Sequence, residues 1–384
     1  MEFSEMMKVC ISRETGGGRM PGHGTHFAFT GLPGVEIAAL ADSNPEAESD
    51  YRLTGAKRLY KSFTDMMDRE KPDIVILSSR LPREHYEQIK YALNRQCHVF
   101  CEKPLAETLV QADELIRLSR ETGYLVQMAH PARFAPAFRE MKRLILSGGI
   151  GKILTCYMRG KEDYRGGGED MLVLGTHMLD AACWIFGLPE QVYSDIRFQG
   201  KPLTVRDILP TAEPIGPCGG DEVFSIYRFP GCVNGIFESR RDVTPNGVAR
   251  LGMTVCGTAG MLSIRYSGNR ELRVCRDFPV PPEDHADFQT VPVPAPPAIP
   301  GAETIDLKKW NIDPEPYIFH YFSENNRRAA WNLLQAIAKK EPLEAGIDSV
   351  VHSLEMITGA YQSALRHGPV SFPLKDRRHP LAEN

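Results

Sequence analysis

Glu102 and Lys103 are two residues whose types and placement in the sequence point to chemistry. They follow directly on an apolar run, His98–Cys101, and a proline and a helical pattern come after them. The run predicts a buried strand, and open α/β sheets bind their ligands at the carboxyl ends of strands. A lysine in that place can stabilise negative charge that develops on a substrate oxygen. These residues alone leave a solvated lysine in a strand-to-helix turn equally open.

His177 is the second candidate for chemistry. It precedes Asp180 by three residues within an apolar helical pattern, so the two side chains share one face of the predicted helix. The ordinary pKa of histidine, about 6.5, lies close to working pH, which suits a group that takes up and returns a proton. A single histidine on a helix is more often structural, so the helical pattern by itself does not assign the role.

The elements before that strand follow the order of a dinucleotide-binding βαβ unit. A strand at Lys8–Ser12 precedes a glycine-rich loop and the first turns of a helix at His26–Leu32, and a second strand, Val35–Ala41, ends in Asp42. Asp42 is placed to bind ribose hydroxyls and to repel a 2′-phosphate, so it favours NAD over NADP. The loop has no regular GxGxxG, which leaves a plain surface loop open. Its glycines, which would let the backbone approach a pyrophosphate, are Gly16, Gly18, Gly22 and Gly24.

Continuous apolar strands continue to alternate with helices through the first third of the chain. This alternation predicts a parallel sheet covered by helices on both faces. The further strands are expected at Asp73–Ser78, His98–Cys101 and Tyr124–Ala129, and the helices at Ala47–Lys57, Ser62–Arg69, Glu84–Gln96 and Leu109–Glu121.

The later part of the chain has a different pattern. From Asp221 strand-like runs follow one another without helices, which predicts a mostly antiparallel sheet. Pro279–Pro300 contains eight prolines and is expected to be an irregular excursion. The fold class is therefore α/β, with a Rossmann dinucleotide-binding domain at 1–130. A second α/β domain at 131–384, with a large, mostly antiparallel open sheet, is expected to bind substrate and to form oligomers. Its helices are expected at Ala135–Leu146, Asn325–Ala338 and Ile347–Leu365.

Composition excludes several classes of protein. The 384 residues are 42% hydrophobic and 24% charged, and the net charge of −4 offers no basic surface for nucleic acid. No apolar run reaches the length of about 18 residues that a membrane span needs. The acidic start lacks the features of a secretory signal, so a cytoplasmic protein is expected. The spacing of the nine cysteines predicts buried thiols and no metal site.

Several motifs together resemble the Gfo/Idh/MocA family of NAD(P)-dependent oxidoreductases, and the resemblance spans nearly the whole chain. It implies hydride exchange between a nicotinamide and a CH–OH carbon. The motifs are ALADSNPE around Asp42, DIVILSS with the later His85, Glu102-Lys103-Pro104 with Leu105-Ala106, the segment His130–Ile153, GTHMLD around His177, and SALRHGPVSFPL near the end.

The resemblance also implies roles for individual residues. Lys103 and His177 would be catalytic and would handle the proton of the substrate hydroxyl. The contacts to the cofactor would come from the glycine loop, Asp42, Ser78, Ser79, Arg80, His85, Glu102, Lys103, His130 and Arg133.

Val173 departs from the pattern of the family. Many members carry an aspartate four residues before the histidine, as a second catalytic partner, and valine cannot act in that role. Glu169, Asp170 or Asp180 are the possible substitutes, and Tyr164 and Arg165 could contact substrate from the glycine loop that precedes the helix. The proton relay is therefore left open.

The leading hypothesis is an NAD-dependent dehydrogenase that acts on a sugar, glycoside or cyclitol. Two alternatives are a redox-neutral enzyme that retains NAD and oxidises its substrate only transiently, and a non-catalytic NAD or sugar sensor. An open sheet with a half-apolar face is a liability if left bare, so a homodimer or homotetramer through the C-terminal sheet is expected.

Overall fold

The computed structural model describes residues 6–13, 23–43, 53–243, 250–266, 271–276, 287–304 and 316–382, with the backbone alone at 316–321. The chain forms two compact units, Met1–Phe134 with Pro297–Val350 and Ala135–Pro296 with Val351–Asn384. The first unit thus takes in residues 297–350, which a single division at residue 130 assigns to the second domain. The reason is α8 (Pro316–Lys339), which packs on η1, η3 and β6 of the first unit.

The first unit contains a six-stranded parallel sheet in the order β3-β2-β1-β4-β5-β6. This is the strand order of a doubly wound dinucleotide-binding sheet, which confirms the predicted fold class. The strands lie on the predicted apolar runs, except β3, whose residues are largely exposed and give no apolar signal. Their bounds are β1 Met7–Ser12, β2 Val35–Ala41, β3 Arg58–Tyr60, β4 Ile74–Leu77, β5 His98–Cys101 and β6 Val126–Met128.

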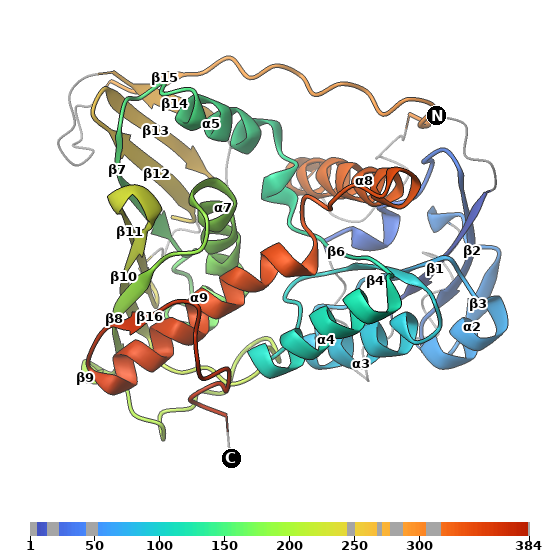
Figure 1. The fold of residues 1–384 in the computed structure, drawn as a ribbon, viewed down its shortest axis with the longest axis horizontal. Helices are drawn as coiled ribbons and strands as arrows, with labels where there is room; N and C mark the ends of the chain where they lie inside the picture. Colours follow the sequence, from blue (N-terminus) through green and yellow to red (C-terminus); the bar gives the residue numbers. More distant parts are fainter. Residues whose placement is uncertain are drawn as a thin grey trace. The chain divides into compact units, whose positions relative to one another are not determined.

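Three helices on one face of this sheet connect its strands, and α8 lies on the other face (Figure 1). They are α2 (Phe63–Glu70), α3 (Pro82–Leu93) and α4 (Leu109–Thr122). Two of them begin at caps: Ser62 accepts from the Asp65 amide, and Thr108 forms a capping box with Gln111. The predicted start of α3, Glu84, is two residues too late. The helix begins at Pro82, a first-turn position in which the missing N–H of proline is not needed.

The first crossover of the sheet differs from the prediction. Between β1 and β2 the described residues form only a short 3-10 turn, η1 (Thr25–Phe27), where a helix over His26–Leu32 was expected. Gly31, within the range of the expected helix, takes a positive φ of 68°, which a right-handed helix does not contain. The expected helix at Ala47–Lys57 lies largely outside the described residues.

The second unit is built on a ten-stranded sheet in the order β15-β14-β13-β12-β7-β11-β10-β8-β16, with β9 paired to β8. Only β7 and β11 pair in parallel, so the predicted, mostly antiparallel sheet is confirmed. The Pro-rich excursion contributes β15 to it, so this segment is not wholly irregular. The bounds are β7 Ile153–Arg159, β8 Gln191–Phe198, β9 Lys201–Pro202, β10 Glu222–Phe229, β11 Val233–Arg240, β12 Gly252–Gly257, β13 Gly260–Arg265, β14 Leu272–Cys275, β15 Gln289–Thr290 and β16 Val370–Ser371.

Helices cover one face of this sheet (Figure 1). α5 packs on β13 and β14, and α7 packs on β7. α9 is tied to β8 and β10, because the Ser363 hydroxyl accepts from the Ser194 amide and the Tyr227 hydroxyl donates to the Met356 carbonyl. The bounds of these helices are α5 Pro136–Leu146, α7 Thr176–Phe186 and α9 Ile347–Arg366.

Candidate active site

The carboxyl edge of the six-stranded sheet carries the predicted nucleotide-binding residues. Asp42, Ser78 and Glu102 directly follow β2, β4 and β5, and Ser12 ends β1. All the strand pairings are parallel, so these residues lie along one edge. β1 and β4 are the neighbours at which the strand order reverses, and open α/β sheets bind ligands outside such a point.

Asp42 is fixed at the end of β2. Its amide donates to the Tyr60 carbonyl, and its side chain is only 8% exposed. The Nε atom of Arg13 lies 3.7 Å from the carboxylate, a cation that sequence reasoning did not place there. Of the four loop glycines, Gly24 has a φ of 72° at the start of η1, and Gly16, Gly18 and Gly22 lie outside the described residues.

A cavity of about 640 Å³ lies beside this edge and was not predicted from the sequence. One wall comes from the start of α2, which directly follows β3, and the other from α3. Gln88 links the cavity to the end of β1, because Ser12 Oγ donates to its Oε1 over 3.5 Å. Both walls lie on helices that the sequence predicts, but how closely two helices approach each other is set by the tertiary fold. The lining residues are Ser62, Phe63, Thr64, Arg83, Glu84, Glu87, Gln88 and Tyr91.

Glu102 is a buried carboxylate held by the η1 region. Its Oε2 accepts from the Thr25 hydroxyl, and its Oε1 lies 3.5 Å from Nδ1 of His23. His23 in turn stacks on Phe322 of α8 with the ring centroids 4.7 Å apart. Burial alone would raise the pKa of Glu102, but His23, the charge of Lys103 and the Thr25 hydroxyl together lower it. The site therefore presents an ionised Glu102 next to Lys103, which is only 2% exposed.

His85 is buried and bridges two loops, and its contact with the cofactor stays a prediction. Its Nδ1 lies 2.7 Å from the Pro104 carbonyl oxygen and its Nε2 lies 2.8 Å from the Ser79 carbonyl oxygen. Burial lowers the pKa of His85, although both carbonyls and the charge of Glu102 oppose this. The ring therefore holds the loop after β4 against the turn that carries Lys103.

The other predicted cofactor contacts after β4 and β6 are also largely internal. Ser78 donates its hydroxyl to the Ser12 carbonyl, and the Ser79 hydroxyl accepts from the Leu81 amide. Arg133, 2% exposed, donates to the Glu344 carbonyl and the Ser349 hydroxyl, so its guanidinium fastens residues 344–349. His130 is buried and Arg80 is half-buried.

His177 lies in the second unit, near the start of α7 and directly after an unusual helical turn. α6 (Gly168–Asp170), a π-helical turn η4 (Met171–Gly175) and α7 follow one another without a break. π-helical turns inside helices are frequent at functional sites. A Cβ atom on Gly175 would come within 2.6 Å of the Phe237 ring, so glycine is required there for the helix to lie on β11.

The His177 side chain is 2% exposed and packs against Tyr266, which follows β13. The ring centroids are 4.7 Å apart with an interplanar angle of 19°. The Tyr266 hydroxyl lies 3.4 Å from Nδ1 of His177. Sequence reasoning missed this neighbour, because 89 residues separate the two positions.

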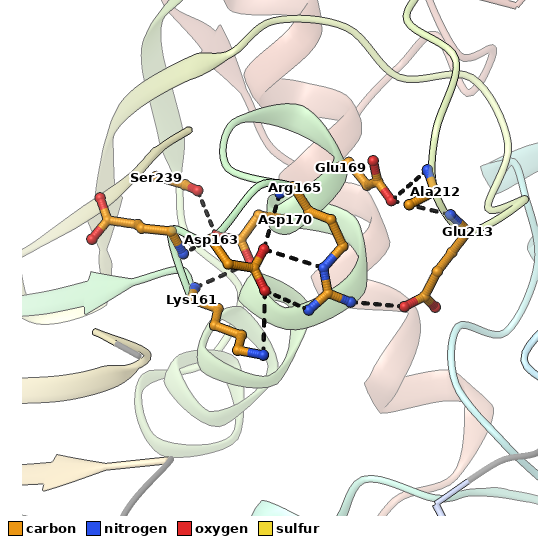
Figure 2. Close-up of polar contacts among 9 residues, drawn as sticks. Lys161, Asp163, Arg165, Glu169, Asp170, Ala212, Glu213 and Ser239 are labelled. Atoms are coloured by element: carbon orange, nitrogen blue, oxygen red, sulfur yellow. Dashed lines mark hydrogen bonds and ion pairs between the residues drawn. The ribbon is translucent and has the colours of Figure 1, made fainter. Parts of the chain in front are cut away.

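Asp170 is committed to the backbone of the loop before the helix (Figure 2). It accepts from the amides of Lys161 and Glu162 over 3.1 and 3.0 Å, and from the Ser239 hydroxyl over 2.6 Å. Its side chain is fully buried, and burial raises its pKa despite these donors. Asp170 therefore anchors this loop, and its contact with substrate stays a prediction.

Arg165 is likewise engaged within the protein (Figure 2). Its guanidinium donates to Asp163 and Glu213 over 2.8 Å each. Burial alone would lower the pKa of Arg165, but the two acids outweigh burial and raise it. Burial alone would raise the pKa of Asp163, but Arg165 lowers it to about 2. Glu169 accepts from the amides of Ala212 and Glu213. Arg165 and Glu169 thus fix the loop around residue 212 to the glycine loop.

Tyr164 and Asp180 are the remaining predicted substrate contacts. Tyr164 is 63% exposed at the tip of the glycine loop, which leaves it accessible to a ligand. Asp180 is fully buried on the helix that carries His177. Val173 is also buried, with an exposed fraction of 2%. Among the candidates considered for the missing carboxylate, Glu169 and Asp170 are thus used elsewhere.

The described part of the chain has neither a metal-binding cluster nor a membrane-spanning helix. No group of three or more histidine, cysteine, aspartate or glutamate side chains is placed to hold a metal ion there. No helix among those residues has the length and apolar character to cross a bilayer.

Comparison with known proteins places the chain in a family. Residues 15–130 match an oxidoreductase family described by its NAD-binding Rossmann fold, and residues 138–263 match the GFO/IDH/MocA C-terminal domain. The two matches together span more than half of the chain. The protein belongs to the GFO/IDH/MocA family.

Relatives of known name support this membership in the GFO/IDH/MocA family. Inositol 2-dehydrogenase 2 of Saccharopolyspora erythraea is 30% identical over 65% of this chain and 74% of its own length. D-glucoside 3-dehydrogenase of Escherichia coli is 30% identical over 40% of this chain, and the match spans about half of that relative, as with several others. The solved levoglucosan dehydrogenase in complex with NADH and levoglucosan shares the fold, with a TM-score of 0.73 at 21% identity over 96% of this chain and all of that one.

The NAD of the GFO/IDH/MocA family fits the described residues of the first unit. Asp42 supplies the acid that ribose hydroxyls require, at the carboxyl edge of a sheet of NAD-binding type. Asp42 and the other residues at this edge would therefore hold the dinucleotide.

Proposed function

We propose that this protein is an NAD-dependent dehydrogenase that oxidises a CH–OH carbon of a sugar, glycoside or cyclitol. The observation that supports this most directly is the buried, charged Glu102–Lys103 pair at the edge of a sheet of NAD-binding type. Burying a lysine and an ionised carboxylate costs desolvation free energy. Groups whose pKa is perturbed by such burial cluster at functional sites.

The reaction divides between cofactor and protein. NAD⁺ supplies the acceptor for the hydride that leaves the carbon. The hydroxyl proton must leave at the same time, and His177 is proposed to take it, after which it passes to solvent. The ammonium of Lys103 stabilises the negative charge that develops on the substrate oxygen. Carbon is oxidised to a carbonyl, and one NADH and one proton are formed for each turnover.

The substrate class rests on the names of the relatives. Two of them are named for the oxidation of a D-glucoside and of inositol, which are both polyhydroxylated rings. Tyr164, exposed on the glycine loop, is proposed to contact such a ring, and aromatic side chains pack well on the apolar faces of sugars.

The proposal is tested by incubating the purified protein with NAD⁺ and a panel of methyl glucosides, levoglucosan, apiose and inositols. NADH absorbance should rise with at least one of them. Copurified NAD with conversion of a glycoside but no net NADH would instead indicate a redox-neutral enzyme. Tight NAD binding without conversion of any compound would contradict both and favour a sensor.

Replacing Asp42 by alanine is expected to change the cofactor preference. The wild type should favour NAD over NADP, because the carboxylate bonds to ribose hydroxyls and repels a 2′-phosphate. The variant should lose roughly 10- to 100-fold in kcat/KM for NAD, the equivalent of one hydrogen bond to a charged group. Its use of NADP should improve, since Arg13, 3.7 Å from Asp42, becomes available to the phosphate.

The control for this variant is Asp65→Ala, which removes an exposed acid of the same unit. Initial rates with both cofactors at saturating sugar measure the preference. Equal use of NAD and NADP by the wild type would contradict the assignment of Asp42.

We further propose that the uncovered face of the ten-stranded sheet joins copies of this chain. Tyr193, Ile226, Ile236 and Tyr157 are neighbours in a row across β8, β10, β11 and β7. Tyr193 and Ile226 are 50% and 40% exposed, whereas the alternate residues of these strands face the helices and are buried. An exposed apolar row of this kind is typical of an interface.

Ile226→Glu is expected to shift the protein to smaller assemblies, because it places a charge in the middle of the row. Light scattering coupled to size-exclusion chromatography measures the mass. Val205→Glu, at an exposed apolar residue outside the sheet, is the control and should leave the mass unchanged. A monomeric wild type at micromolar concentration would contradict the interface.

A further inference from the structure

The second unit contains a partner for His177 that the sequence did not reveal. The position four residues before it is Val173, and Glu169 and Asp170 bond to backbone amides of neighbouring loops. None of these three can therefore orient the imidazole as a carboxylate partner, and Asp180, fully buried three residues after His177 on the same helix, is the remaining acidic candidate. The aromatic ring of Tyr266 lies parallel to the imidazole, at a centroid distance of 4.7 Å.

Tyr266 is held firmly where it meets His177. Its amide donates to the Leu251 carbonyl over 2.9 Å, which fastens the chain directly after β13. Its ring also contacts Phe138 of α5 edge-on, with the centroids 6.1 Å apart. Tyr266 is 3% exposed, so its ring position is set by packing on both sides. A side chain fixed in this way can restrict the rotation of the imidazole that it covers.

The hydroxyl of Tyr266 suits a histidine that changes its protonation state. It lies 3.4 Å from Nδ1 and can donate to that atom when it is unprotonated or accept from it when it carries a proton. A carboxylate can only accept, and its charge stabilises the imidazolium strongly. A histidine with such a partner gives up its proton more readily than one beside a carboxylate.

We propose that Tyr266 is a positioning residue of His177, one that the sequence pattern of the family does not include. Its ring fixes the plane of the imidazole and its hydroxyl serves Nδ1, which leaves Nε2 to exchange the proton of the substrate hydroxyl. This inference rests on the proposed function, because it assumes that His177 handles that proton.

The test compares Tyr266→Phe, which keeps the ring and removes the hydroxyl, with Tyr266→Leu, which removes both. Tyr227→Phe is the matched control, since Tyr227 is a buried tyrosine of the same unit whose hydroxyl donates to the Met356 carbonyl. Tyr266→Phe should lower kcat by roughly 10-fold with little change in KM, less than the loss of an acid–base group. The acidic limb of its pH–kcat profile should move down by about half a unit to one unit, because the hydroxyl bonds the charged imidazole more strongly than the neutral one.

A second measurement does not depend on turnover. In protein labelled with ¹⁵N-histidine, the His177 signal is assigned by its disappearance in His177→Gln and is then titrated. The wild-type shifts should show a hydrogen-bonded Nδ1, and Tyr266→Phe should lower the midpoint of the titration. This result would stand even if no sugar reduced NAD⁺, so the two proposals fail separately. A Tyr266→Phe protein with an unchanged His177 titration and an unchanged pH profile would overturn the inference and leave Tyr266 as packing alone.

Discussion

Lys103→Met is expected to lower kcat by roughly 10³-fold, within the range that acid–base and electrostatic groups contribute. Methionine retains much of the length and apolar stem of lysine, so the turn after β5 should keep its shape. The variant removes the positive charge that would meet the developing oxyanion. It also removes one of the causes that lower the pKa of Glu102, although the Thr25 hydroxyl and His23 remain on that carboxylate.

The measurement is single-turnover NADH formation, with NAD⁺ affinity determined separately by calorimetry. NAD⁺ affinity should change by less than about tenfold, the equivalent of one modest interaction. Lys90→Met is the control, because Lys90 bonds to Glu114 between α3 and α4 and lies 31% exposed. A Lys103→Met protein that retains the wild-type rate would show that this lysine belongs to the fold and not to the reaction.

Asp170→Ala is expected to have the largest effect on stability. It removes the acceptor of two amides and one hydroxyl, all in a buried place, and each unsatisfied group costs about 1–3 kcal/mol. Burial raises the pKa of Asp170, so ionising it costs the folded state free energy as the pH rises through that pKa, and alanine relieves this cost. The net loss in free energy of unfolding should therefore be about 3 kcal/mol, near the low end of the summed cost of the three unsatisfied donors.

Scanning calorimetry should detect this loss as a fall of roughly 10 °C in the transition of the second unit. Asp195→Ala is the control, because Asp195 is 43% exposed and its pair with Arg197 should contribute about 1 kcal/mol or less. An unchanged transition in Asp170→Ala would mean that the glycine loop is not anchored by this carboxylate, and a direct contact of Asp170 with substrate would then return as the better explanation.

The periodicity of the sequence was sufficient for most of the first unit. Its central strands are continuous apolar runs, and Asp42 and Glu102-Lys103 directly follow two of them, which needs no knowledge of distant residues. The prediction did not reach β3, because a short edge strand with exposed side chains carries no apolar signal. The cavity between α2 and α3 was missed because the approach of two helices is set by the tertiary fold.

Internal bonds of polar side chains could not be predicted from the sequence. His85, Arg133, Arg165 and Asp170 are polar residues near motifs of the family, and ligand contacts were expected of them. Each also bonds to protein groups, most of them contributed by another segment of the chain. A polar residue and its internal partner are set together by the tertiary fold, so the sequence cannot distinguish a structural anchor from a binding residue.

The sequence by itself determined the class of fold, the family, and the placement of Asp42 and Lys103 at strand ends, because these depend on local patterns that the chain carries in order. The tertiary structure alone decided the surroundings of the reactive groups. It set His23 and Thr25 on Glu102, and it brought Tyr266 to His177 across 89 residues. Such neighbours depend on strand order and on how helices pack on the sheets, and neither is encoded in the spacing of residues along the chain.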